Sequence, residues 1–191
     1  ALDAPTERVI GEAVAILKRI ARRCAAEGRR AEGFEPPWTT VHTGTFHAGT
    51  ILNIVPDRAE FVFEVRSIPG DDAESVLAEL RAELEREVLA ELRRVAPDAG
   101  LTFRRRCDAP PCDLPEESGL LRLVRDCGAR GAPARVPYGT EAGVFQAAGI
   151  ATLVCGPGDV AQAHQPEEWI AEAELAACDR FLAALGDRLA A

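Results

Sequence analysis

Hydrophobic and polar positions follow two different periods along the first half of the chain. Apolar side chains recur every three or four residues over 7–28 and about 72–95, as in amphipathic helices. Inward and outward residues alternate over 58–67, and β-branched and polar residues alternate over 39–47, as in strands; 101–107 is predicted to be a third strand. The inward faces of the two helices are predicted to consist of Ile10, Val14, Leu17, Ala21 and Cys24, and of Leu77, Leu80, Leu84, Val88, Leu92 and Val95.

The order helix, strand, strand, helix, strand is that of a ferredoxin-like split β-α-β unit that lacks its opening strand. The first two strands are expected to pair antiparallel, because a short loop joins them. The strand 101–107 is expected to run parallel to 58–67, separated from it by the place of one strand, a gap of roughly 10 Å. Either residues outside this chain fill that place or 101–107 is displaced, and we interpret the chain as a fragment.

The second half of the chain predicts shorter elements. The proline-rich segment 108–115 is the best linker candidate. A helix is predicted over 118–128, another helix after Gly139, and a buried strand at 151–155. The apolar stripe of a final helix is predicted to be Leu175, Cys178, Leu182, Leu185 and Leu189. The predicted fold class is α+β, with one domain at 1–112 and a second, α/β domain at 113–191.

Composition excludes several classes of partner. A net charge of -9 and a pI near 4.9 argue against a nucleic-acid surface or an anionic membrane surface. No apolar run approaches the length of a membrane span and no targeting segment is visible, so a cytoplasmic protein is expected. The six cysteines are predicted to be mostly buried free thiols. A Cys107–Cys112 disulfide, or half of a zinc knuckle there, is a weaker alternative.

Two short segments could carry chemistry. Gly139, Thr140 and Glu141 place a hydroxyl and a carboxylate at a predicted helix start, which suits either an anion or simple capping. His164 follows a Gly-Pro-Gly loop beyond the predicted strand 151–155, where open α/β sheets bind ligands. Because catalytic zinc takes three protein ligands, the residues alone favour a structural role for His164. A Cys155 nucleophile with His164 as its base is a weaker alternative, since no third orienting group is evident.

Three motifs carry a resemblance to a known family. They are Tyr138-Gly-Thr-Glu-Ala-Gly143, Cys155-Gly-Pro-Gly158 followed by Ala163-His164, and His47-Ala-Gly-Thr-Ile-Leu-Asn-Ile-Val-Pro56. The chain resembles the zinc-dependent amidohydrolases of the acetylornithine deacetylase, aminoacylase and succinyl-diaminopimelate desuccinylase family, and most of all the acetylornithine deacetylase branch. The resemblance covers nearly the whole chain but only the later part of a family member. It implies a lid domain for dimerisation at 1–112 and the C-terminal part of a two-metal peptidase-like catalytic domain at 113–191.

The resemblance also implies roles for individual residues. His164 would be the last ligand of a site for two zinc ions, with cobalt possible, whose other ligands and general base lie outside this chain. Asn53 and Arg66 would reach the substrate carboxylate, often across the dimer. The other residues assigned to substrate binding are His47, Gly139, Thr140 and Glu141. Alternatives stay open: Arg66 as a charged strand end facing water, and His47 as a strand histidine with its hydrogen bonds satisfied. His42 is expected to be structural.

The function implied is therefore that of part of a metal-dependent deacylase. The intact enzyme would hydrolyse the amide of an N-acyl amino acid with a metal-activated water, as a cytoplasmic homodimer in arginine biosynthesis. No catalytic residue is assigned within this chain, which is expected to be inactive alone. The alternative is a non-catalytic dimerisation module of the same family.

Overall fold

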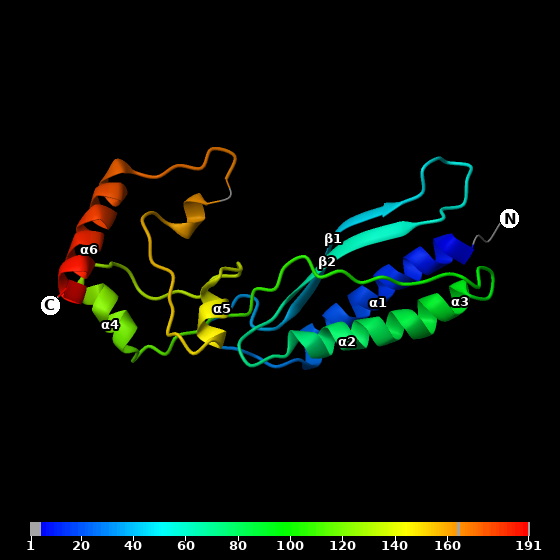
Figure 1. Cartoon of the computed structure of the whole chain (residues 1–191), viewed down its shortest axis with the longest axis horizontal. Helices are drawn as coiled ribbons and strands as arrows, with labels where there is room; N and C mark the ends of the chain where they lie inside the picture. Colours follow the sequence, from blue (N-terminus) through cyan, green and yellow to red (C-terminus); the bar gives the residue numbers. More distant parts are fainter. Residues whose placement is uncertain (1–4, 164, 191) are drawn as a thin grey trace. The chain divides into compact units, whose positions relative to one another are not determined.

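The computed structural model describes residues 5–163 and 165–190, and internal contacts divide the chain into two compact units. Unit 1 extends to Pro111 and includes Val136–Tyr138, whereas unit 2 consists of Cys112–Arg135 and the chain from Gly139 onward. Unit 1 contains α1 (Pro5–Glu27), β1 (Thr40–Ala48), β2 (Ala59–Arg66), α2 (Ala73–Glu83), the π-helical η1 (Leu84–Leu89) and α3 (Ala90–Leu92). Unit 2 contains α4 (Gly119–Asp126), α5 (Ala142–Ala147), the 3-10 helix η2 (Val160–Gln162) and α6 (Glu172–Ala190), as labelled in Figure 1.

The predicted first helix is confirmed as α1, but its buried face differs from the predicted one. Leu17 and Cys24 are buried as expected. Val14 and Ala21 are only half-buried, and the side chain of Ile10 lies outside the described part of the chain. The rest of the buried face is Val9, Ala13, Ile16 and Ile20. Because α1 is apolar along two neighbouring stripes, its sequence allows either face inward, and packing against α2 selects one.

The predicted second helix is confirmed as the continuous run of α2, η1 and α3. Leu80, Leu84 and Val88 are buried as predicted, whereas Leu77 is half-buried and Val95 is 61% exposed. Asp72 caps the start of α2 by accepting a hydrogen bond from the backbone N–H of Glu74 at 2.9 Å. Since η1 has more residues per turn than an α-helix, the buried stripe shifts along it and brings Leu89 inward.

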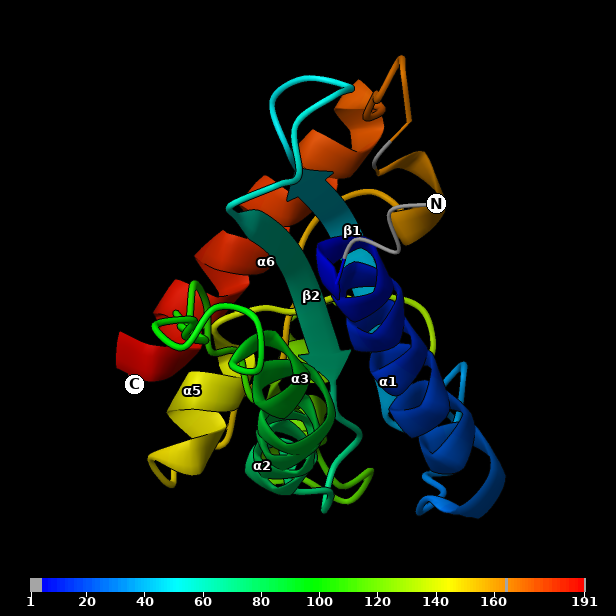
Figure 2. The same ribbon diagram turned by 90° about the vertical axis from the view of Figure 1, so that its right-hand side faces the viewer.

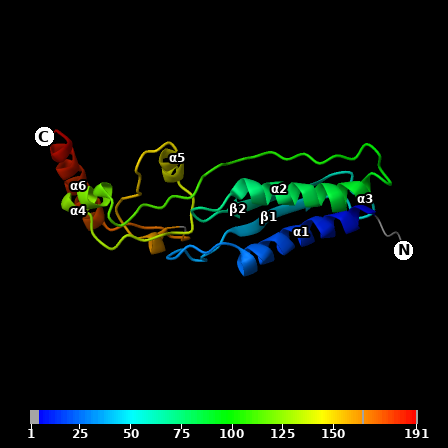
Figure 3. The same cartoon turned by 90° about the horizontal axis from the view of Figure 1, so that it is seen from below.

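The two predicted strands of unit 1 are confirmed as an antiparallel hairpin, with Thr40 opposite Arg66 and His47 opposite Glu60. Phe61, Phe63 and Val65 of β2 pack against the buried side chains of α1 and α2. Figures 2 and 3 show the hairpin and these two helices running side by side. A β-bulge between Thr43 and Thr45 interrupts the pairing, so that one residue of β1, Gly44, is not paired with a residue of β2.

The prediction of a strand at 101–107 is wrong. This segment turns back after α3 and runs alongside α2 (Figures 1 and 3) without strand pairing, and the sheet formed by the described residues has two strands. Leu101 and Phe103 nevertheless pack against the core with one residue between them, as they would on one face of a strand. Arg81 lies over the ring of Phe103, with 4.6 Å between its guanidinium carbon and the ring centroid. No backbone hydrogen bond joins 61–66 to 101–106, both of which are described, and the ferredoxin-like sheet is not completed by these residues.

The helices predicted for unit 2 are confirmed, but the predicted strand is not. The predicted helix 118–128 is α4, capped by Ser118, and the final helix is α6. The prediction of a strand at 151–155 is wrong, because this segment has no strand pairing. The stripe predicted for the final helix is not a buried face: Leu175, Leu182 and Leu189 are exposed, and no residue of α6 is buried. An apolar run forms a strand only where a neighbouring strand accepts its hydrogen bonds, and the described residues supply none here.

Candidate functional site

Arg66, the last residue of β2, is held by three hydrogen bonds from its guanidinium group. Nε donates to Oε1 of Glu64 at 2.9 Å and Nη2 donates to Oε2 of Glu64 at 3.3 Å. Nη1 donates to the backbone carbonyl of Pro137 at 2.5 Å. The side chain remains 55% exposed. Arg66 thus donates two hydrogen bonds to one carboxylate while solvent still reaches the pair. Arginine recognises carboxylate ligands through the same two-donor geometry.

His47 and Asn53 lie at the opposite end of the hairpin from Arg66. His47 is near the end of β1 and exposed, and Asn53 is exposed in the loop that follows. Since His47 pairs with Glu60, six strand positions separate it from Arg66, or about 20 Å along the strand. The structure therefore does not bring Arg66 together with His47 or Asn53 within one chain. A small substrate that contacts both sets would have to meet them on two different chains.

Gly139, Thr140 and Glu141 precede α5, the short helix predicted after the glycine turn. The Thr140 hydroxyl accepts a hydrogen bond from the backbone N–H of Ala142 at 3.2 Å, so capping accounts for this side chain. Glu141 is the N-cap residue by its backbone, but its side chain makes no capping bond and is exposed. Of the three residues, Glu141 is therefore the one whose side chain takes no part in capping the helix.

The loop that leads to His164 is shaped by a capping box that the sequence also contains. The carboxylate of Asp159 accepts a hydrogen bond from the N–H of Ala161 at 2.8 Å, and the side-chain oxygen of Gln162 accepts one from the N–H of Asp159 at 3.0 Å. Gly158 has a positive φ of 86°, which suits glycine. His164 itself lies outside the described residues, so its predicted role as a metal ligand stays a prediction. The Asp-x-x-Gln spacing was a readable signal for this turn.

The described residues do not form a metal site on their own. No group of three or more histidine, cysteine, aspartate or glutamate side chains among them could hold a metal ion. His42 and His47 stand on one exposed face of the hairpin, opposite Glu64 and Glu60 respectively. Because a catalytic zinc takes three protein ligands, two zinc ions would need ligands beyond the described part of the chain.

The cysteines give no support to the thiol alternatives. All six are free, so a Cys107–Cys112 disulfide is not formed. The prediction that most cysteines are buried is wrong, because only Cys24 and Cys127 are buried, while Cys107 and Cys155 are exposed. Partial burial, and next the neighbouring Cys178, raise the pKa of the Cys155 thiol. An activated nucleophile needs the opposite shift, because the thiolate is the reactive form.

Two partners of predicted site residues were not anticipated from the sequence. Glu64 is two residues before Arg66 in the same strand, and this spacing places both side chains on one face, so the pair could have been read from the sequence. The second partner is the carbonyl of Pro137, seventy-one residues away from Arg66, for which the sequence has no signal.

Comparisons with known proteins agree with the family resemblance. Residues 5–91 match the peptidase dimerisation domain family, M20. The chain is similar to an acetylornithine deacetylase of Myxococcus xanthus, 36% identical over 80% of this chain and 38% of that protein. It is also similar to an acetylornithine deacetylase of Buchnera aphidicola, 28% identical over 72% of this chain and 34% of that protein. The chain thus spans little more than a third of the length of these relatives.

A solved structure shares the fold. Aminopeptidase PepT of Bacillus cereus superposes with a TM-score of 0.58 at 21% identity, over 91% of this chain and 45% of that one. No helix of the described part is long and apolar enough to cross a bilayer. Residues 5–91 thus match a peptidase dimerisation domain of the M20 type, and most of the chain is similar to acetylornithine deacetylases.

Proposed function

We propose that this chain is the lid and C-terminal portion of an acetylornithine deacetylase-like amidohydrolase, which hydrolyses the amide of an N-acyl amino acid in the cytoplasm. The observation that carries the proposal is the pair of hydrogen bonds that Arg66 donates to the carboxylate of Glu64. A substrate carboxylate has the same shape and charge as that of Glu64. We propose that it takes the place of Glu64 on the exposed guanidinium group.

The separation of Arg66 from His47 and Asn53 supports a dimeric site. The family that matches residues 5–91 is a dimerisation domain, and a homodimer would supply the two ends of the hairpin from different chains. In this arrangement His47 and Asn53 contact the substrate held in the partner subunit's site. Gly139, Thr140 and Glu141 are further proposed contacts, and His164 is the proposed metal ligand.

The hydrolytic step itself is not assigned to the described residues. They hold no cluster of metal ligands, and a pair of zinc or cobalt ions in the intact enzyme would depend on ligands elsewhere. The chain alone is therefore expected to leave N-acetylornithine intact in the presence of added zinc, as measured by ninhydrin detection of released amine. Turnover above the buffer blank would contradict this expectation.

The carboxylate role is tested in a full-length enzyme that contains this sequence. Arg66→Ala is expected to lower kcat/KM for the N-acyl amino acid about tenfold to more than a hundredfold, because a hydrogen bond to a charged group is worth about 1.5–3 kcal/mol. Arg58→Ala is the matched control, because Arg58 is 81% exposed and pairs with Glu60 on the same hairpin. Equal kcat/KM values for the two variants would refute the role of Arg66.

A non-catalytic dimerisation module is the second candidate, favoured by the missing metal cluster in the described residues. Metal analysis of the same full-length protein separates the two. Stoichiometric zinc or cobalt supports the enzyme, and a dimer that binds neither metal supports the module.

A further inference from the structure

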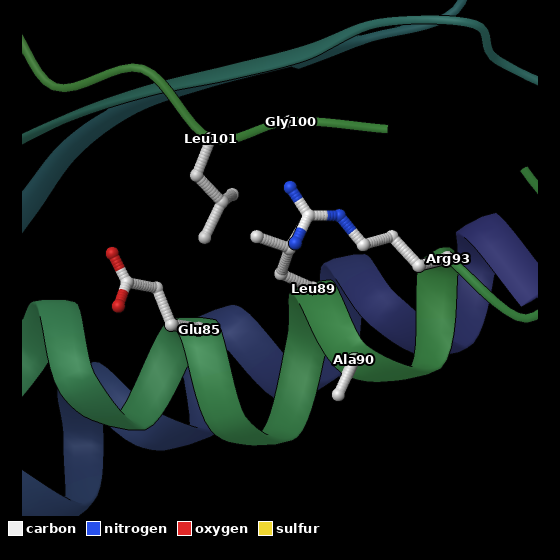
Figure 4. Close-up of a pocket in the computed structure, with 6 residues that line it drawn as sticks. All are labelled: Glu85, Leu89, Ala90, Arg93, Gly100 and Leu101. Carbon is white, nitrogen blue, oxygen red and sulfur yellow. The ribbon is translucent and has the colours of Figure 1, made fainter. Parts of the chain in front are cut away.

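A cavity of about 480 Å³ opens between the helical run η1–α3 and the segment that follows it. Its lining consists of Glu85, Leu89, Ala90, Arg93, Gly100 and Leu101. All of these belong to unit 1, and none is among the residues assigned to the deacylase site. The volume lies within the range of small-molecule sites, and the cavity is broadly open to solvent. Figure 4 shows side chains of both charges directed from the helix toward the segment at Gly100 and Leu101.

The floor of the cavity is apolar and its two ends are oppositely charged. Leu89 is 8% exposed and Leu101 is half-buried against the core. In Figure 4 the Glu85 carboxylate lies to the left of both leucines, and the Arg93 guanidinium group lies to the right of Leu101 and overlaps Leu89 in this view. Ala90 also lines the cavity, and its backbone N–H donates to the carbonyl of Glu85 in the π-helical register.

The charged groups are available to a ligand. Nε of Arg93 donates to the backbone carbonyl of Ala99 at 3.1 Å, which fixes the plane of the guanidinium group. Its two Nη atoms make no hydrogen bond or ion pair with the described residues. The carboxylate of Glu85 likewise has no ion pair with a residue of the described part, although Arg86 beside it pairs with Glu83 and Glu87. An anion is thus recognised at one end and a cation at the other.

The spacing of the two ends restricts the ligand further. Glu85 and Arg93 are eight residues apart, at most about 12 Å along the helix axis, since the π-helical η1 advances less per residue than an α-helix. Their side chains shorten this span, but a carboxylate and an ammonium on the same carbon atom would be too close together to meet both. The ligand therefore needs a short apolar chain between its charges, lying over Leu89 and Leu101.

We propose that this cavity binds a small dipolar molecule, an amino acid whose carboxylate and ammonium groups stand at opposite ends of a short methylene chain. Arg93 holds the carboxylate with its Nη atoms and Glu85 holds the ammonium. The two leucines contact the methylene groups. This site does not depend on the deacylase proposal, because it uses other residues.

The test is titration calorimetry of the 191-residue chain at low salt, with 5-aminopentanoate as the probe and pentanoate and pentylamine as one-charge analogues. We expect one saturable site for 5-aminopentanoate and affinities at least about tenfold weaker for both analogues, since each lacks one charge-assisted contact. Arg93→Gln and Glu85→Gln should each weaken 5-aminopentanoate binding to a similar extent. In Arg93→Gln the preference for 5-aminopentanoate over pentylamine should disappear.

Matched controls are available next to the cavity. Arg94→Gln and Asp98→Asn change exposed charges that do not line it, and both should leave the affinity unchanged. Thermal unfolding of each variant verifies that it is folded. No detectable binding of 5-aminopentanoate, equal binding of either analogue, or unchanged affinity in Arg93→Gln would overturn the proposal.

Discussion

The two units bury their apolar side chains to very different degrees. Among its described side chains, unit 1 has four large ones that are fully buried, Ile16, Ile20, Leu80 and Leu84. Within the described part of unit 2, the buried apolar side chains are Val124, Cys127 and Ala142, while Phe145, Trp169 and Leu182 are each more than half exposed. Both units have helices with apolar stripes. A stripe becomes a core only where a second apolar surface faces it, and in unit 1 α1, α2 and the hairpin do so.

The largest effect expected from this comparison is that of truncating one leucine in each unit. Leu80→Ala leaves a cavity among α1, α2 and β2 and should lower the free energy of unfolding of unit 1 by about 2–5 kcal/mol. Leu182→Ala in α6 removes a side chain that is 55% exposed and should change the stability of unit 2 by only about 0.5 kcal/mol.

The two tryptophans allow the units to be followed separately. Trp38 belongs to unit 1 and Trp169 to unit 2, and the chain has no third tryptophan. Urea unfolding of Trp169→Phe and Trp38→Phe backgrounds then reports each unit through the remaining fluorophore. If Leu182→Ala destabilised its unit as much as Leu80→Ala destabilises the other, the described difference in burial would be wrong.

A pair of glycines sharpens the comparison at smaller amplitude. A Cβ at Gly28, just after α1, would lie 2.4 Å from the backbone carbonyl oxygen of Cys24, so Gly28→Ala should destabilise unit 1 by about 1–3 kcal/mol. A Cβ at Gly186 within α6 would meet nothing within 4 Å. Gly186→Ala should therefore stabilise unit 2 by about 0.5–1 kcal/mol, because alanine loses less backbone entropy in a helix.

The same two reporters measure this pair of substitutions. Opposite signs at the two positions are the expected outcome. A neutral Gly28→Ala would show that the end of α1 can shift to make room for the extra methyl group.

The smallest effect expected is a pH dependence confined to unit 1. Hydrogen bonds from Arg86, and then from Arg19, lower the pKa of Glu87. A lowered pKa means that this pairing stabilises the fold above the ordinary carboxyl range and that its contribution is lost as pH falls through the lowered pKa. Glu87→Gln should therefore flatten the acid side of the unit 1 stability profile.

This prediction is measured by urea midpoints from neutral pH down to below about 4, near the ordinary glutamate pKa. Glu85→Gln is the control, because Glu85 has no ion pair with the described residues and should leave the acid side unchanged. Identical acid profiles for Glu87→Gln and the unsubstituted chain would contradict the assignment.

Local pattern was enough to predict most helices and the hairpin, but not what they pack against. The predicted strand 101–107 does not form, because a strand needs a partner for its backbone groups, although Leu101 and Phe103 both pack against the core. The prediction of which face of α1 is buried is partly wrong, because two apolar stripes lie next to each other in its sequence.

The candidate site divides in the same way. The local context of Arg66 and Thr140 was accessible to sequence reasoning, through strand alternation and capping preferences. The distance between Arg66 and His47 required the pairing register of the hairpin, which the motifs alone do not contain. The carbonyl of Pro137 required the tertiary fold.

The bulge in β1 also determines which changes in chain length the hairpin can absorb. Plain alternation would put His42 and His47, five residues apart, on opposite faces, whereas the bulge places them on one face, opposite Glu64 and Glu60. Deleting Gly44 would restore regular pairing and leave every other side chain on its present face. Deleting Val41 or His42 instead would exchange inward and outward positions over part of the strand. Among one-residue deletions in this part of β1, natural variants should therefore tolerate the loss of residue 44 best.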